Sequence, residues 1–137
     1  MFVYKKIIIV LVFCFYSIKN VAQVYRFKAV SFSVMEKLSK DKWGDWAEFE
    51  PSTTIISIDG KKDRIVVASR EIQLFKIINY GEKISKAKTD TVVFNCIDND
   101  GGDVTIIVIT YKNEDDRMQF YVNYQDVKMV YNVYKVK

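Results

Sequence analysis

The chain has 137 residues, half of them hydrophobic, with 21 basic residues, 17 acidic residues and no histidine. The lack of histidine excludes Ser-His-Asp and Cys-His catalytic groups, and it excludes histidine-ligated zinc, copper and non-haem iron sites. No glycine-rich phosphate loop links a strand to a helix, so the common nucleotide-binding motifs are absent. We therefore expect no cofactor and no enzyme of these classes.

The first 22 residues have the composition of a secretory signal peptide. Two lysines near the start precede an apolar stretch, and Ala22 supplies a small residue before a cut at Gln23. The apolar stretch is shorter than the ~20 residues of a transmembrane helix. Phe13 is too bulky for the position before a lipid-modified Cys14. We expect cleavage near Ala22, no lipid anchor, no transmembrane helix in the mature chain, and a secreted or periplasmic protein.

The remaining residues, 23–137, have the length of one domain. Loss of Lys5, Lys6 and Lys19 with the leader leaves 18 basic and 17 acidic residues, a net charge of +1. Such a surface gives no electrostatic reason to bind nucleic acid. Only Cys96 remains, which we interpret as a small buried side chain, with a reactive thiol or an intermolecular disulfide as alternatives.

Alternating apolar and polar residues predict short β-strands along this domain, and no amphipathic helix is indicated. The first strand covers 24–29 and continues over 30–35, before a polar loop over 36–42. Pro51 predicts an edge, a bend or a bulge. The lysine-rich residues 81–90 predict a mobile surface loop. The later strands cover 46–50, 53–58, 64–69, 72–78, 91–98, 104–112, 118–124 and 127–136, and the lysine-rich loop covers 81–90.

About eight short strands with regular turns predict an all-β domain, an antiparallel meander closed into a small barrel. A β-sandwich is the alternative. The hairpin over 94–109 is expected at the centre of the fold, because 104–109 is rich in β-branched residues. The turn of this hairpin is acidic, but it does not match the EF-hand template. We predict no metal site, and the only weak candidates for calcium are Asp98, Asp100 and Asp103.

The string Trp43-Gly44-Asp45-Trp46 places two indole rings around a glycine. Such rings plug the end of a barrel, or they form a gate or platform for a ligand. Glu48 and Glu50 are two residues apart in a predicted strand, so they are expected on the same face as Trp46. Paired carboxylates leave a glycan hydrolase open as a further hypothesis.

Tyrosines gather in the last three predicted strands. Gln119 and Asn123 share a face with Tyr121, because residues two apart in a strand point the same way. Rings stack and amides form hydrogen bonds, so this face suits a carbohydrate or a protein partner. Aromatic pairing that only stabilises the sheet is the alternative.

The leader ending in Val21-Ala22-Gln23, the Trp43–Trp46 string and the closing segments 120–124 and 130–133 resemble small uncharacterised secreted proteins of the Bacteroidetes. That resemblance implies export and no particular activity. The Gly44-Asp45-Trp46 string is also similar to the Gly-x-Trp feature near the start of lipocalin-type barrels. This second likeness implies a barrel with an interior cavity.

We therefore predict an exported, non-catalytic β-barrel binding protein. Its ligand is expected to be a small apolar molecule or a glycan, with Trp43 or Trp46 at the mouth of a cavity. The alternative is a surface that binds a protein or a glycan through Tyr121, Gln119 and Asn123. A carboxylate-dependent hydrolase is the third hypothesis.

Overall fold

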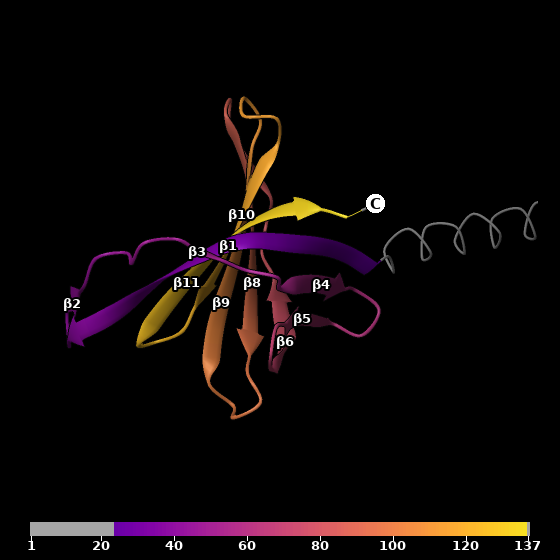
Figure 1. The fold of residues 1–137 in the computed structure, drawn as a ribbon. Helices are drawn as coiled ribbons and strands as arrows, with labels where there is room; N and C mark the ends of the chain where they lie inside the picture. The colour runs from indigo at the N-terminus through magenta and orange to yellow at the C-terminus, as the bar shows by residue number, and fades with distance from the viewer. Residues whose placement is uncertain (1–23, 137) are drawn as a thin grey trace, which may run out of the picture.

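A computed structural model describes residues 24–136, and every regular element in this part of the chain is a β-strand. Eight antiparallel strands close into a barrel, which confirms the predicted fold class, and three two-residue strands lie outside it (Figure 1). The barrel strands, in spatial order, are β1 (Val24–Ser39), β4 (Ile55–Asp59), β5 (Arg64–Ala68), β6 (Ile72–Tyr80), β8 (Thr89–Ile97), β9 (Asp103–Tyr111), β10 (Arg117–Asn123) and β11 (Val127–Lys135). The short strands are β2 (Lys42–Trp43), β3 (Glu50–Pro51) and β7 (Ile84–Ser85).

The predicted signal peptide, its cleavage near Ala22 and Cys14 all lie outside the described residues. Within residues 24–136 the structure has no helix that is long and apolar enough to cross a membrane.

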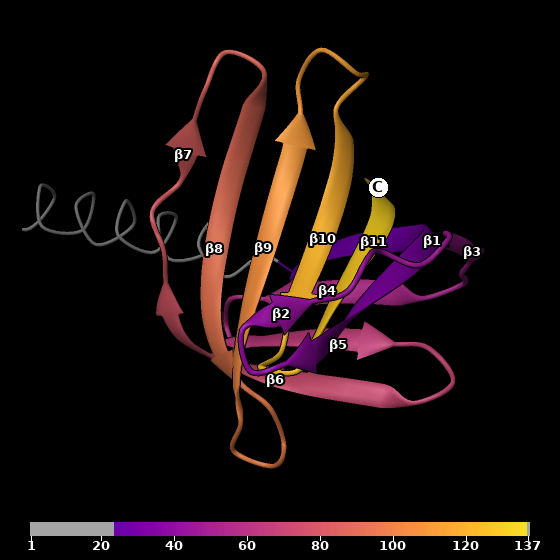
Figure 2. The same cartoon turned by 90° about the vertical axis from the view of Figure 1, so that its left-hand side faces the viewer.

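The barrel consists of two crossed layers. Figure 2 shows β8, β9 and β10 side by side, with β5 and β6 running across them. β1 belongs to both layers, since Phe27 pairs with Ile56 of β4 on one side and with Lys135 of β11 on the other. A bulge between Ala29 and Ser31 changes the register of β1 at this corner, and bulges of this kind bend a strand.

Large side chains fill the interior of the barrel. Phe75 and Phe120 are at most 1% exposed, and the rings of Phe27 and Phe120 are 5.6 Å apart. An eight-stranded barrel has an interior only wide enough for side chains or one small ligand, and here the side chains occupy it. Buried side chains therefore form a core inside the barrel, and the interior cavity that the lipocalin likeness implies stays a prediction.

The β8–β9 hairpin holds the middle of one layer. Its two strands pair without interruption from Thr89 and Tyr111 to Ile97 and Asp103. The turn is closed by Asp98, whose Oδ1 accepts hydrogen bonds from the backbone N–H groups of Asp100 and Gly102 at 2.9 and 2.8 Å. Gly101 has a φ of 81°, a conformation that favours glycine. The acidic turn is therefore explained by the geometry of the hairpin.

Two of the predicted loops contain strand pairing. The predicted loop over 36–42 is wrong, because β1 extends to Ser39 and pairs there with β2. Pairing of Glu36 with Val127 of β11 supports this extension despite its polar composition. The predicted loop over 81–90 is wrong in part, because β7 pairs with the start of β8.

The predicted strand over 46–50 is also wrong. Residues 44–49 form no ladder, and only β3 remains, pairing with Ser31 and Phe32 beside the bulge of β1. Pro51 thus lies in a two-residue strand beside a bulge, as its chemistry predicts. Alternation in sequence misled the prediction, because residues 44–49 meet β1 through separate hydrogen bonds such as that from Ala47 to Val34, and the side chains of residues 45–49 are exposed.

The packed core gives the first prediction. Phe120→Ala removes a ring that is completely buried, so the free energy of unfolding should fall by about 3–5 kcal/mol. Phe49→Ala is the control, because Phe49 is 50% exposed and its removal should cost no more than about 0.5 kcal/mol. Urea unfolding measures both values, and equal losses would contradict the assignment of Phe120 to the core.

Cys96 gives the second prediction. Its side chain is buried in the core, and burial raises the pKa of its thiol to about 11. The thiolate is the reactive form, so a raised pKa means less thiolate at neutral pH and slower alkylation. Labelling by iodoacetamide at pH 8 should be on the order of 100-fold slower in the native protein than in urea. The native rate should rise toward pH 11, and rapid native labelling at pH 8 would identify a reactive thiol instead.

Candidate ligand-binding face

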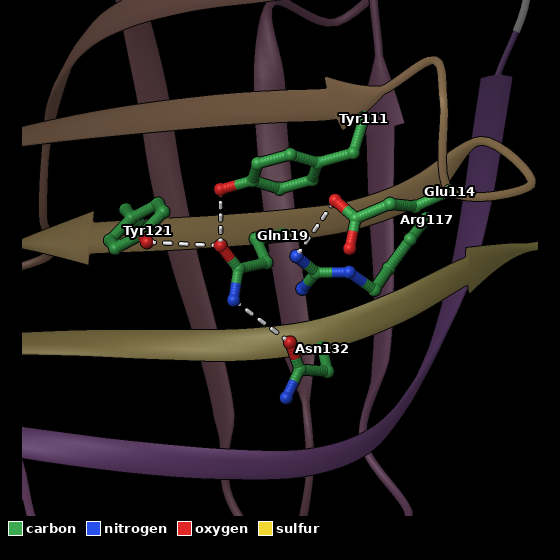
Figure 3. Close-up of polar contacts among 6 residues, drawn as sticks. All are labelled: Tyr111, Glu114, Arg117, Gln119, Tyr121 and Asn132. Atoms are coloured by element: carbon green, nitrogen blue, oxygen red, sulfur yellow. Dashed lines mark hydrogen bonds and ion pairs between the residues drawn. The ribbon is translucent and has the colours of Figure 1, made fainter. Parts of the chain in front are cut away.

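Outward-pointing side chains of four neighbouring strands form a polar ladder on the surface of the barrel. Figure 3 shows the part of this ladder that lies on β9, β10 and β11. Register places Gln119 of β10 opposite Asn132 of β11, and Asn132 opposite Ser31 of β1. We call the set of five side chains the tyrosine face: Ser31, Tyr111, Gln119, Tyr121 and Asn132.

Hydrogen bonds connect all five members of the tyrosine face. The hydroxyls of Tyr111 and Tyr121 both donate to Oε1 of Gln119, at 2.7 and 3.0 Å. Nε2 of Gln119 donates to Oδ1 of Asn132 at 3.0 Å, and Nδ2 of Asn132 donates to Oγ of Ser31 at 3.0 Å. Each bond fixes the orientation of the next amide, so the ladder is held in one arrangement. One N–H of each amide and the oxygens of both phenols still have capacity for a ligand.

Aromatic and charged neighbours hold both tyrosine rings in place. The guanidinium of Arg117 lies 4.2 Å from the ring centroid of Tyr111 and pairs with Glu114 at 3.4 Å (Figure 3). The ring of Trp46 meets that of Tyr121 edge to face at 6.2 Å. Burial raises the pKa of Tyr121, and Tyr111 adds to this rise, so the phenol remains a neutral donor at physiological pH.

Residues 44–49, which we call the crossing segment, bring Trp46 to this position. The backbone N–H of Ala47 donates to the carbonyl of Val34 at 2.9 Å, and Oγ of Ser33 donates to the carbonyl of Ala47 at 2.6 Å. Ser33 is only 1% exposed, and Val130, its register partner, is 3% exposed. The crossing segment therefore lies over the outer side of β1, where Ala47 is bonded to both Ser33 and Val34.

The five side chains that the sequence singled out all lie on one outer side of the barrel. Trp43 and Trp46 are on the outer surface. The barrel has two depressions at its ends, one lined by Phe75 and Tyr124 and the other by Phe27 and Phe94, and neither tryptophan lines them. The ammonium groups of Lys128 and Lys37 lie 4.4 and 5.6 Å from the ring of Trp43.

Of these five side chains, Tyr121 and Gln119 belong to the hydrogen-bonded ladder, and Trp46 contacts it. Asn123 does not join the ladder. It lies opposite Lys128 in the register, and its buried Oδ1 has no hydrogen-bond partner among the described residues. Trp43 is placed near Asn123 through its contact with Lys128.

Sequence reasoning missed Asn132 and Ser31 as members of the site. Asn132 lies between apolar neighbours in β11, and a search for polar residues at outward positions would have found it. Ser31 is 101 residues away from Asn132 in the chain, so only closure of the barrel brings the two together. Tyr111 was noted among the tyrosines, but its bond to Gln119 depends on the β9–β10 register.

The other sequence candidates are not assembled into a site. Glu48 and Glu50 are exposed, and the strand that would have aligned them with Trp46 does not form. Of the weak calcium candidates, Asp98 already accepts hydrogen bonds through Oδ1 from two backbone N–H groups of its own turn. Within residues 24–136, no group of three or more acidic, cysteine or histidine side chains is close enough to hold a metal.

Comparisons of the chain with protein-family models, with curated proteins and with solved structures found no match. A barrel fold supports many unrelated functions, so the fold does not indicate one. The function must be argued from the geometry of the tyrosine face and of the depressions at the barrel ends.

The ladder gives the third prediction. Gln119→Ala removes the acceptor of two phenols and the donor to Asn132, so the free energy of unfolding should fall by about 1–2 kcal/mol. Gln125→Ala, at an exposed position in the β10–β11 turn, is the matched control and should change it by less than about 0.5 kcal/mol. Equal effects in urea unfolding would show that the ladder does not hold the tyrosine face together.

Proposed function

We propose that the protein is an exported, non-catalytic binding module that contacts its ligand through the tyrosine face. One observation carries this proposal: five polar side chains from four strands are held in a single hydrogen-bonded arrangement at the surface. A rigid polar surface binds with a smaller loss of conformational entropy than a mobile one. The leader sequence supports export, and the packed interior favours a surface site over an internal one.

The chemistry of the tyrosine face favours a neutral glycan. Amide N–H groups and phenol oxygens lie along the ladder, so donors and acceptors are both available to sugar hydroxyls. The rings of Tyr121 and Trp46 lie beside them and provide apolar contact for the faces of sugar rings. The near-neutral charge of the mature chain gives no preference for a strongly charged ligand.

A protein partner is the second candidate, and exposed apolar residues of the crossing segment and of the end of β1 favour it. Trp46 and Phe49 of the crossing segment are 39% and 50% exposed, and Leu38 at the end of β1 is 66% exposed. Aromatic residues are enriched at protein interfaces. A protein would use these apolar side chains together with the ladder, whereas a glycan would depend on the ladder and the tyrosine rings.

Binding to a panel of neutral polysaccharides and a glycan array tests this proposal. For any glycan that the natural protein binds, Tyr121→Ala should weaken binding at least ~10-fold, because it removes both a ring and a hydroxyl of the ladder. Tyr134→Ala is the matched control. Tyr134 is 48% exposed on β11 but takes no part in the ladder, so its removal should leave binding unchanged.

Two further variants separate the candidates. Leu38→Ser and Phe49→Ser should leave glycan binding intact, but they should weaken capture of a protein partner from the culture medium or the cell surface. If every partner or glycan of the natural protein is retained by Tyr121→Ala, the tyrosine face is not the binding site.

A further inference from the structure

One end of the barrel opens into a depression that the tyrosine face does not include. It has a volume of about 380 Å³, within the range of ~300–1,000 Å³ that ligand pockets occupy. Its floor is formed by buried core residues from both layers, Phe27, Phe94 and Val108. Its walls are the partly buried side chains of Ile58, Val92 and Met118. The interior of the depression is therefore strongly apolar.

The rim of the same depression is polar. Asp90 of β8 and Thr110 of β9 lie opposite each other in the register and continue the inward-facing series of Val92 and Val108. Lys83, from the connection between β6 and β7, completes this side of the rim. An apolar floor below a polar rim matches a molecule that has an apolar body and a polar head.

The position of Lys83 depends on a close approach between two chain segments. The backbone N–H of Gly81 donates to the carbonyl of Val93 at 2.8 Å. A Cβ at position 81 would lie only 2.7 Å from that carbonyl oxygen. Glycine is therefore required for the segment that carries Lys83 to lie against β8 beside the depression.

The carboxylate of Asp90 has two closer partners than Lys83. Its Oδ1 accepts a hydrogen bond from Ser85 at 2.6 Å and pairs with the ammonium of Lys112 at 3.0 Å, and both contacts lower the pKa of Asp90. Lys83 lies 3.9 Å from Oδ2, and its side chain is 63% exposed. The ammonium of Lys83 can therefore turn to a ligand while Asp90 keeps its stronger partners.

The charges at the rim favour an anionic head. Lys135 lies over the ring of Tyr25, which also lines the depression, at 5.0 Å from the ring centroid. The Asp90 carboxylate is thus paired with two ammonium groups, those of Lys83 and Lys112, and a third, that of Lys135, lies over the lining residue Tyr25.

We infer that this depression is a second binding site, separate from the tyrosine face, for a small amphiphile with an apolar body and a carboxylate head. The apolar body lies on Phe27, Phe94 and Val108, and the carboxylate pairs with Lys83. The hydroxyl of Thr110 is placed to donate to the same head. The site requires no opening of the packed core, because the depression lies above it.

Three probes of equal chain length test the inference: octanoate, octanol and octyltrimethylammonium, each below its aggregation concentration and measured by calorimetry with the folded protein. Octanoate should bind saturably and ~3-fold more tightly than octanol, a difference of about 0.65 kcal/mol that one exposed ion pair can supply. Octyltrimethylammonium should bind least tightly, because Lys83 repels it.

Two variants and two controls locate the site. Lys83→Ala should reduce the affinity for octanoate to that for octanol, and Thr110→Trp should abolish binding of both by filling the mouth. Lys40→Ala, in the β1–β2 turn, should bind octanoate normally. So should Tyr121→Ala, which makes this test independent of the proposed function. Thermal unfolding of each variant checks that it is folded.

Three results would overturn the inference. The first is the absence of saturable octanoate binding to the natural protein. The second is octanoate binding that survives in a folded Thr110→Trp variant. The third is a preference for octyltrimethylammonium over octanoate, which would assign the rim to a cation.

Discussion

Pairing of β1 with β11 closes the sheet into a barrel, and both candidate binding regions depend on this pairing. An open sheet would leave the backbone groups of two long edges without partners, whereas closure satisfies them within the chain. The bulge between Ala29 and Ser31 allows β1 to pair with β4 in one layer and to continue along β11 in the other. Closure also brings Ser31 to Asn132, which completes the ladder of the tyrosine face.

The size of the barrel restricts where a ligand can bind. Eight strands enclose a space that holds buried side chains such as Phe75 and Phe120. The same packing places Cys96 in the core and raises the pKa of its thiol. The two proposed binding regions therefore lie on the outer surface and at the end of the barrel. There, inward-facing positions carry Asp90 and Thr110 in place of apolar residues.

The outer surface is organised by a segment with little regular structure of its own. The crossing segment is attached to β1 through the hydrogen bonds of Ala47 with Val34 and Ser33. Trp46 packs against Tyr121, while Gln119 accepts hydrogen bonds from Tyr121 and Tyr111. Packing and hydrogen bonds thus act on the same ring from two sides, which gives a surface that needs little rearrangement to bind.

Reading of the amino-acid sequence predicted the all-β class, most strand positions and the burial of Cys96 correctly, because these follow from local alternation and turn chemistry. It also singled out Tyr121, Gln119 and Trp46 as side chains suited to a ligand. Only the tertiary structure decided that Trp46 lies outside the barrel, that Ser31 and Asn132 join the ladder, and that Lys83 borders an apolar depression. These facts depend on contacts between distant segments, on strand register and on barrel closure, none of which local periodicity specifies.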